Sequence, residues 1–172
     1  AFEALSLNPD KVTGYDLSEG MIKYGREKAV KQGVQDKVVF IKGDSERMPF
    51  DDNSFDAITV GFGVRNFENL EKGLGEMLRV LRPGGRAVIL EFSKPKMFPI
   101  KQLFNFYSKY FIPFFGKRIS KDERAYAYLP ESVAAFPEGK EMQAVMEKVG
   151  YTSVKIIPLS GGISSIYIGT KN

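Results

Sequence analysis

In SFDAITVGFGVRNF, at residues 54–67, a short strand runs straight into a glycine-broken loop. The AITV run is apolar or β-branched over a length that predicts a strand covered on both faces. Because glycine has no side chain, we expect Gly61 and Gly63 to adopt backbone angles that other residues avoid, and to let a ligand approach the main chain. Arg65 adds a side chain that is always positively charged, and Asn66 adds an amide that can both donate and accept hydrogen bonds. Ligands of open α/β sheets bind beyond the carboxyl ends of the strands, so this loop is the first candidate site.

The composition limits the classes of protein to consider. With 172 residues, 43% of them hydrophobic, one packed domain over residues 1–172 is expected. No apolar run approaches the roughly 18 residues of a membrane span, and no secretory leader is visible, so we expect a soluble, cytoplasmic protein. His and Cys are absent, so we predict no metal site and no thiol nucleophile. Acid-base chemistry then falls to carboxylates, Tyr, water or the substrate.

Strand and helix patterns alternate along the chain, as they do in parallel sheets. The expected strands are residues 12–17, 37–42, 57–60 and 86–92, and the expected helices are 19–32, 70–81 and 139–149. The RPGG word at residues 82–85 predicts a tight turn. Residues 154–158 and 163–170 predict a hairpin that closes the sheet. The predicted fold is therefore α/β, with a mostly parallel sheet and an antiparallel C-terminal hairpin.

Two acidic residues follow successive strands. Asp16 stands just before a helix that Ser18 caps, where an acid accepts hydrogen bonds from ribose hydroxyls in nucleotide-binding sheets. Asp44 adds a carboxylate on the same rim, suited to the exocyclic amine of a purine. Each Asp alone is also explained as the cap of a turn. Together they favour a nucleotide site.

Three more polar residues have two interpretations each. Arg65 and Asn66 are either a surface cation and a helix cap or ligand-binding groups, and the two adjacent glycines favour the second interpretation. Glu91 ends an apolar strand, where a carboxylate is costly unless it is paired or functional. Pairing with an arginine and a catalytic role stay open for Glu91.

Residues 94–118 contain no acid, six basic residues and eight aromatic ones. Three interpretations of the aromatic residues are open: they complete the core, they line an apolar substrate pocket, or they lie with the lysines on an anionic membrane surface. Lysines without acids favour the last two interpretations. Nucleic acid is disfavoured, because aromatic residues replace the polar ones that read bases. We therefore expect residues 94–136 to form a substrate lid.

The words YDLSEGM, GDSERMPF, SFDAITVGFGVRNF, RVLRPGGR and LEFSKP, in this order and spacing, closely resemble the UbiE/COQ5 family of quinone C-methyltransferases. The resemblance covers nearly the whole chain. It implies a Rossmann-like class I methyltransferase that uses S-adenosylmethionine. The implied reaction methylates a ring carbon of a polyprenylated hydroquinone, either a demethylmenaquinol or a ubiquinol precursor. The implied location is cytoplasmic, including the inner face of the membrane, and whether the protein forms a homodimer stays open.

The resemblance also implies roles for individual residues. The implied cofactor-binding residues are Asp16, Leu17, Asp44, Ser45, Gly61 and Phe62. The implied catalytic residues are Arg65, Asn66, Glu91, Tyr107 and Tyr128. Arg65 is always protonated, so it would stabilise the developing phenolate while a positioned water takes the proton.

One departure from the family is large. The family begins with a strand and a glycine-rich DxGxGxG turn, and neither is found before Ala1. We therefore expect this sequence to be an incomplete record of a longer chain. Without that strand, two strands of the sheet are expected to have an unpaired edge. Two other functions stay open: a nicotinamide-dependent oxidoreductase, and a truncated, non-catalytic chain that binds lipid or a partner through its aromatic and basic segment.

Overall fold

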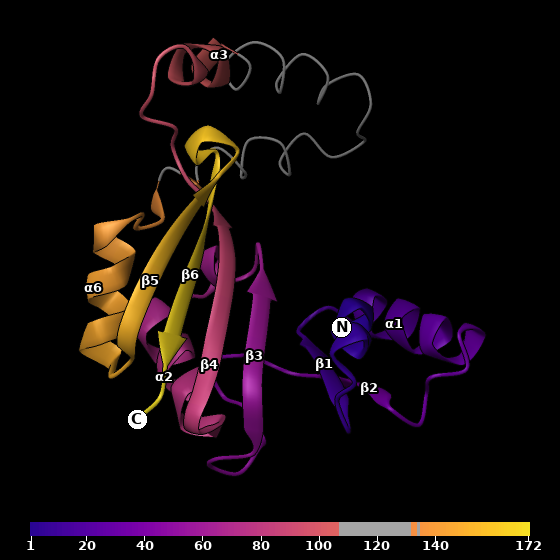
Figure 1. Ribbon diagram of the computed structural model, residues 1–172. Helices are drawn as coiled ribbons and strands as arrows, with labels where there is room; N and C mark the ends of the chain where they lie inside the picture. Colours follow the sequence, from indigo (N-terminus) through magenta and orange to yellow (C-terminus); the bar gives the residue numbers. More distant parts are fainter. Residues whose placement is uncertain (107–131, 134) are drawn as a thin grey trace. The chain divides into compact units, whose positions relative to one another are not determined.

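The computed structural model describes residues 1–106, 132–133 and 135–172. They form two compact units, Ala1–Phe50 and Asp51–Asn172 (Figure 1). Most of the expected lid lies outside the described residues, so the lid and the single domain over 1–172 stay predictions. Within the described part of the chain, no helix has the length and apolar character needed to cross a membrane.

The first unit consists of η1 (Phe2–Leu7), β1 (Val12–Asp16), α1 (Glu19–Lys31) and β2 (Val38–Lys42). The two strands are parallel neighbours, with Asp16 opposite Lys42. Helix α1 begins where predicted, because the Ser18 hydroxyl accepts a hydrogen bond from the Met21 N–H at 3.4 Å. Its end is followed by Gly33 in a left-handed conformation, at φ 67°.

The Phe40 ring explains how closely α1 packs on these strands. A Cβ atom added at Gly14 of β1 or at Gly25 of α1 would come within 2.5 Å of that ring. Both positions therefore need glycine for steric reasons, because the ring occupies the space of a side chain.

The second unit is a four-stranded sheet with two packed helices (Figure 1). Its elements are β3 (Phe55–Gly61), η2 (Val64–Asn66), α2 (Leu70–Val80), β4 (Leu81–Phe92), α3 (Ile100–Phe106), α6 (Lys140–Val149), β5 (Thr152–Leu159), η4 (Ser160–Gly162) and β6 (Ser164–Thr170). The strand order is β3-β4-β6-β5. Strands β3 and β4 are parallel, whereas β6 is antiparallel to both of its neighbours, so the predicted C-terminal hairpin is confirmed. Fully buried side chains of the core include Leu74, Met77, Ile89, Met142, Met146 and Tyr167.

One expectation about β3 is wrong. Ala57 and Thr59 are exposed, so β3 is not covered on both faces. Strand β4 begins at Leu81, earlier than expected, because Leu81 already pairs with Phe55. The RPGG word at residues 82–85 is a register irregularity between this pair and the Ala57–Arg86 pair, with Gly84 in a left-handed conformation at φ 79°. Within the described residues, β1 and β3 have one strand neighbour each, which agrees with the expected unpaired edges.

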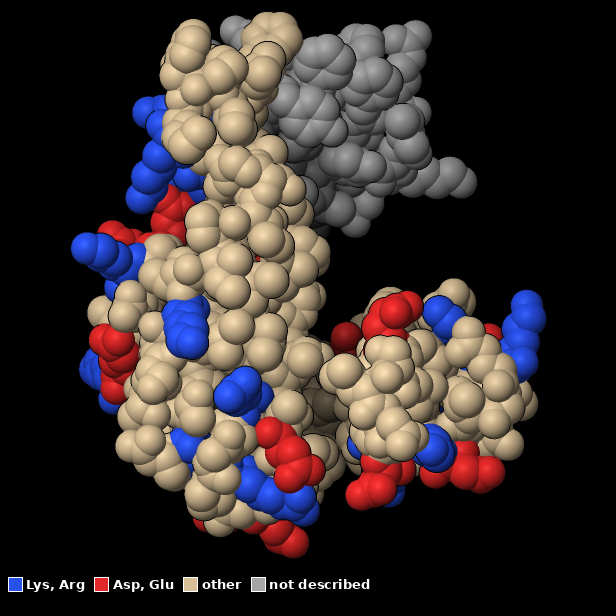
Figure 2. All heavy atoms as spheres, viewed as in Figure 1, with Lys and Arg blue, Asp and Glu red and all other residues tan. Residues whose placement is uncertain are grey.

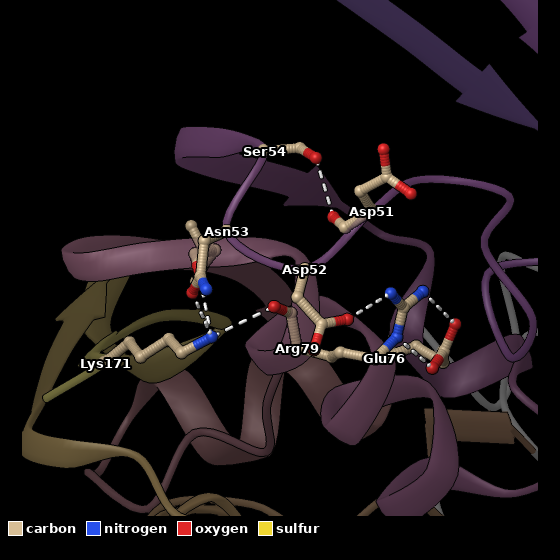
Figure 3. A network of polar contacts seen from close by, with 8 residues as sticks. Asp51, Asp52, Asn53, Ser54, Glu76, Arg79 and Lys171 are labelled. Carbon is tan, nitrogen blue, oxygen red and sulfur yellow. Dashed lines mark hydrogen bonds and ion pairs between the residues drawn. The ribbon is translucent and has the colours of Figure 1, made fainter.

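A polar network ties the C-terminus to the amino end of β3 (Figure 3). The Lys171 ammonium donates hydrogen bonds to Asn53 Oδ1 and to the Arg79 carbonyl, each at 2.9 Å. Arg79 in turn pairs with Asp52 at 2.8 Å and with both oxygens of Glu76. This network lies at the opposite end of β3 from the Arg65 loop, so it supports the sheet without taking part in that candidate site.

Candidate functional site

Asp16 and Asp44 lie together at the carboxyl ends of β1 and β2. The Gly43 N–H donates to the Asp16 carbonyl at 3.0 Å, and the Tyr15 hydroxyl donates to the Asp44 carbonyl at 3.2 Å. These bonds hold the two strand-end loops side by side. The structure therefore places both predicted acids on one rim of the first unit.

Each of these carboxylates also holds its own turn. Asp16 Oδ1 accepts the Ser18 N–H at 2.8 Å, and Asp44 Oδ1 accepts the Glu46 N–H at 2.9 Å. No described residue binds the second oxygen of either exposed side chain. The turn-capping interpretation is thus correct for one oxygen, and the other oxygen is left to accept a hydrogen bond from a ligand.

Two further predicted cofactor residues lie beside these acids. Leu17 follows Asp16 and is 68% exposed, so it offers apolar surface to a flat ring. Ser45 is half-buried after Asp44. Two carboxylate acceptors and an exposed apolar side chain fit the nucleoside half of S-adenosylmethionine.

The loop after β3 turns at Phe62. The sequence had led us to expect the unusual backbone angles at Gly61 and Gly63 instead. Phe62 has φ 57°, whereas Gly63 has φ −115°, so the prediction for the glycines is wrong. The Phe62 N–H donates to the Leu90 carbonyl at 2.8 Å and its ring packs on Phe92, with centroids 4.5 Å apart, which holds the turn. A Cβ atom at Gly61 would meet nothing within 4 Å, so the space beside the main chain is open there, as predicted.

Arg65 and Glu91 form a buried ion pair. Arg65 Nη1 lies 2.9 Å from Glu91 Oε2, with the Glu91 side chain fully buried and that of Arg65 12% exposed. The same nitrogen donates to the Phe62 carbonyl at 2.6 Å. Of the alternatives left open by the sequence, Glu91 is therefore paired with an arginine, and Arg65 is not a surface cation.

Asn66 is exposed in η2 and does not cap the next helix. The cap of α2 is Asn69, whose Oδ1 accepts the Lys72 N–H at 3.0 Å. The helix-cap interpretation of Asn66 is wrong, because η2 and a short extended link separate it from α2. Tyr107 and Tyr128 lie outside the described residues, so their predicted roles stay predictions.

An open pocket of about 440 Å³ lies next to Arg65. Its lining is mainly apolar, with Arg65 and Glu68 as the charged residues. It consists of Val64, Arg65, Phe67, Glu68, Leu70, Ser132, Ala135, Phe136 and Pro137. Ser132, Ala135 and Phe136 fall within the predicted lid at residues 94–136, but the sequence analysis named none of them as a site residue and did not include Pro137, whose only local signal is the Phe-Pro pair before the last helix.

Comparison with known proteins bears directly on this arrangement. Residues 2–171 match the model of the ubiE/COQ5 methyltransferase family. The chain belongs to this family. The resemblance seen in the sequence is therefore confirmed, and the ubiE/COQ5 assignment covers both units.

Curated relatives agree with the ubiE/COQ5 assignment. The chain is 50% identical over 165 residues to a demethylmenaquinone methyltransferase of Bacteroides fragilis, which covers 96% of this chain and 67% of that protein. It is 38% identical over 170 residues to the ubiquinone/menaquinone biosynthesis C-methyltransferase UbiE of Cronobacter sakazakii, covering 99% of this chain and 68% of that one. The chain thus spans about two thirds of the length of these relatives.

Solved structures confirm the fold class. A methyltransferase of Thermotoga maritima, described as S-adenosylmethionine-dependent and a possible histamine N-methyltransferase, superposes with a TM-score of 0.67 at 19% identity. The superposition covers 98% of this chain and 76% of that structure. At this identity the likeness shows the fold alone. Together with the family match, it makes this chain a Rossmann-like methyltransferase, and no comparison favours the oxidoreductase or the non-catalytic alternative.

Proposed function

We propose that the whole protein uses S-adenosylmethionine to methylate a ring carbon of a polyprenylated naphthohydroquinone, and that this chain supplies cofactor-binding and substrate-binding residues. The observation that carries the proposal is the buried Arg65–Glu91 pair beside an apolar pocket, in a chain of the ubiE/COQ5 family. The naphthoquinol is favoured over a benzoquinol because the Bacteroides fragilis relative, 50% identical, is named a demethylmenaquinone methyltransferase.

The first unit binds the nucleoside in this proposal. The free oxygen of Asp16 accepts from the ribose hydroxyls, and that of Asp44 from the adenine amine, with Leu17 and Ser45 beside the ring. Gly61 and Phe62, at the end of β3 in the second unit, are proposed as further cofactor-binding residues. S-adenosylmethionine, when bound, supplies an electrophilic methyl group.

The second unit binds and activates the quinol. Loss of a hydroxyl proton to water turns the hydroquinone into a phenolate, whose neighbouring ring carbon is nucleophilic. The Arg65 guanidinium stabilises the phenolate charge, and the Asn66 amide orients the ring hydroxyl or the water. The ring carbon that gains the methyl group then loses its own hydrogen as a proton, which restores the aromatic ring.

A methyl-transfer assay tests this proposal. Labelled S-adenosylmethionine is offered with a prenylated demethylmenaquinol or a prenylated benzoquinol, to the 172-residue chain and to a version extended by the N-terminal segment of the Bacteroides fragilis relative. We expect a methylated naphthoquinol, formed faster than the benzoquinol product, in at least the extended chain. Cofactor binding by calorimetry without product from either quinol would overturn the proposed reaction.

We further propose that the protein attaches to an anionic membrane through the surface of α3 and the residues before it. Four large apolar side chains are exposed there: Met97 (64%), Phe98 (79%), Leu103 (65%) and Phe106 (53%). Lys96 and Lys101 are exposed among them. In Figure 2 the surface over α3 is largely uncharged, with Lys and Arg side chains along one side. Apolar side chains beside lysines suit the interface of a bilayer that carries negative headgroups.

Vesicle flotation tests this attachment. We expect the chain to float with vesicles that contain phosphatidylglycerol but not with phosphatidylcholine alone, and to be released by salt. The double variants Met97→Ser/Phe98→Ser and Lys96→Glu/Lys101→Glu should each reduce binding, whereas Lys155→Glu, on an exposed position of β5, should affect it less. Equal binding by all four proteins would contradict the proposed surface.

A further inference from the structure

Glu91 is a fully buried carboxylate at the site end of β4. An ionised carboxylate without partners would cost several kcal/mol there. Oε2 accepts from Arg65 Nη1 at 2.9 Å and from the Phe92 N–H at 3.2 Å, and Oε1 accepts from the Arg65 N–H at 3.3 Å. Two of these three donors belong to Arg65, so Glu91 holds both the backbone and the side chain of that residue.

The contacts of Arg65 fix one corner of its guanidinium group. Nη1 has two hydrogens, and both are used, toward Glu91 and toward the Phe62 carbonyl at 2.6 Å. The group also lies over the Phe92 ring, 5.5 Å from its centroid. Because the guanidinium group is planar, holding Nη1 in this way fixes the directions of Nε and Nη2 as well.

The opposite edge of the guanidinium group is left for a ligand. Nε is buried and has no hydrogen-bond partner among the described residues, and no bond of Nη2 to them is observed. Nε and Nη2 together form a two-donor edge of the kind that binds an oxyanion. Arg65 lines the pocket but Glu91 does not, so a substrate would meet the arginine and not the carboxylate.

We propose that Glu91 is a positioning residue that orients the Nε–Nη2 edge of Arg65 toward the substrate oxygen. This inference rests on the proposed function, since the oxygen is that of the quinol. It differs from the catalytic role that the family resemblance implied for Glu91. The carboxylate then acts on the reaction only through Arg65.

The test compares Glu91→Gln in two backgrounds, with Arg65 present and with Arg65→Lys. Gln keeps the size of the side chain but loses the charge that holds Nη1. With Arg65 present we expect kcat to fall about 10-fold or more, with KM for the quinol and affinity for the cofactor changed less than 3-fold. In the Arg65→Lys background the same change should lower kcat less than 3-fold further. Equal kcat losses in the two backgrounds would assign Glu91 a merely structural role.

A measurement on the resting protein separates this inference from the proposed reaction. Nitrogen-15 NMR of arginine side chains reports rotation about the Cζ–Nε bond, and the Arg65 signal is assigned by its loss in Arg65→Lys. We expect slow rotation of Arg65 in the wild-type chain and faster rotation in Glu91→Gln. Fast rotation of Arg65 in the wild type would overturn the positioning role. A wild type with slow rotation but no methyl transfer to any quinol would instead overturn the proposed reaction.

Discussion

The ammonium group of Lys171 lies 2.7 Å from the carbonyl oxygen of Leu81, where helix α2 passes into strand β4. The same group binds the Arg79 carbonyl, so a cation from the C-terminus satisfies two carbonyls at the end of a helix (Figure 3). Helix C-termini carry partial negative charge and carbonyls without helical partners. Lys171 thereby joins β6, α2 and the start of β4 at one point.

Replacing Lys171 by Met should lower the free energy of unfolding of this chain by about 1–3 kcal/mol, because hydrogen bonds from a charged donor are lost while the apolar stem remains. Urea unfolding followed by circular dichroism measures the change. Lys155→Met, on an exposed position of β5, is the matched control and should change the free energy by less than about 0.5 kcal/mol. Similar losses in the two variants would show that the three contacts contribute nothing specific.

Changing Gly25 to Ala should destabilise the chain by about 1–3 kcal/mol, because the new methyl group would enter the space of the Phe40 ring. Gly20, in the same helix, is the control, since the nearest atom to a Cβ there is 3.8 Å away. Gly20→Ala should be neutral or stabilising by up to about 1 kcal/mol. Thermal unfolding should therefore show a lower midpoint for Gly25→Ala and an unchanged or higher midpoint for Gly20→Ala, and an equal fall in both variants would contradict the packing argument.

Asp16→Asn should weaken S-adenosylmethionine binding by about 10-fold or more, because a charged acceptor for the ribose hydroxyls is lost. The turn should survive, since the amide oxygen can still accept the Ser18 N–H. Isothermal calorimetry gives the affinity. Asp36→Asn, which alters an exposed acid just before the amino end of β2, serves as the control. If the two variants bind the cofactor equally well, Asp16 is only a turn residue.

Arg65→Ala should lower turnover by about 10²-fold or more while cofactor affinity changes little, because the lost donor acts on the phenolate. The variant leaves Glu91 buried without its partner, which is itself destabilising, so Arg65→Lys is measured beside it. The lysine variant keeps the charge and loses the planar fork, and we expect an intermediate kcat. Parallel losses of turnover and cofactor affinity would remove Arg65 from the substrate side.

Unfolding should become easier above about pH 10, where exposed tyrosines ionise. Burial raises the pKa of Tyr151 and also that of Tyr167. The unfolded chain releases these protons at lower pH than the folded chain, so the contribution of the two tyrosines to stability is constant below about pH 10. Above it, the free energy of unfolding falls by up to about 1.4 kcal/mol per pH unit for each tyrosine. Tyr151→Phe should remove part of this slope in urea titrations between pH 8 and 11.

The control for the pH dependence is Tyr24→Phe, since Tyr24 is 62% exposed. It should leave the slope unchanged. Tyr151→Phe also loses the bond from the hydroxyl to the Leu74 carbonyl, at 3.1 Å, which adds an offset of about 1 kcal/mol at every pH. An unaltered slope in Tyr151→Phe would mean that this tyrosine does not stay protonated in the folded chain.

The sequence by itself determined the order of strands and helices, the C-terminal hairpin and the family. Hydrophobic periodicity and caps such as Ser18 are local signals, so α1 and α2 were located to within a residue or two. The acids at the ends of β1 and β2 were also predictable, because the carboxyl ends of adjacent parallel strands meet at one edge. The motif words carried the family assignment without any knowledge of the packing.

Only the tertiary structure decided how the polar groups are paired. The sequence left Glu91 between pairing and catalysis, because Arg65 lies on a different element, 26 residues away, and their contact depends on how β3 and β4 align. The loop after β3 turns at Phe62 and not at Gly61 or Gly63 for a similar reason: the Phe62 ring packs against Phe92, which lies on strand β4. The Lys171 network likewise joins residues up to 118 positions apart. Local patterns cannot encode such contacts, which form only when the whole sheet is assembled.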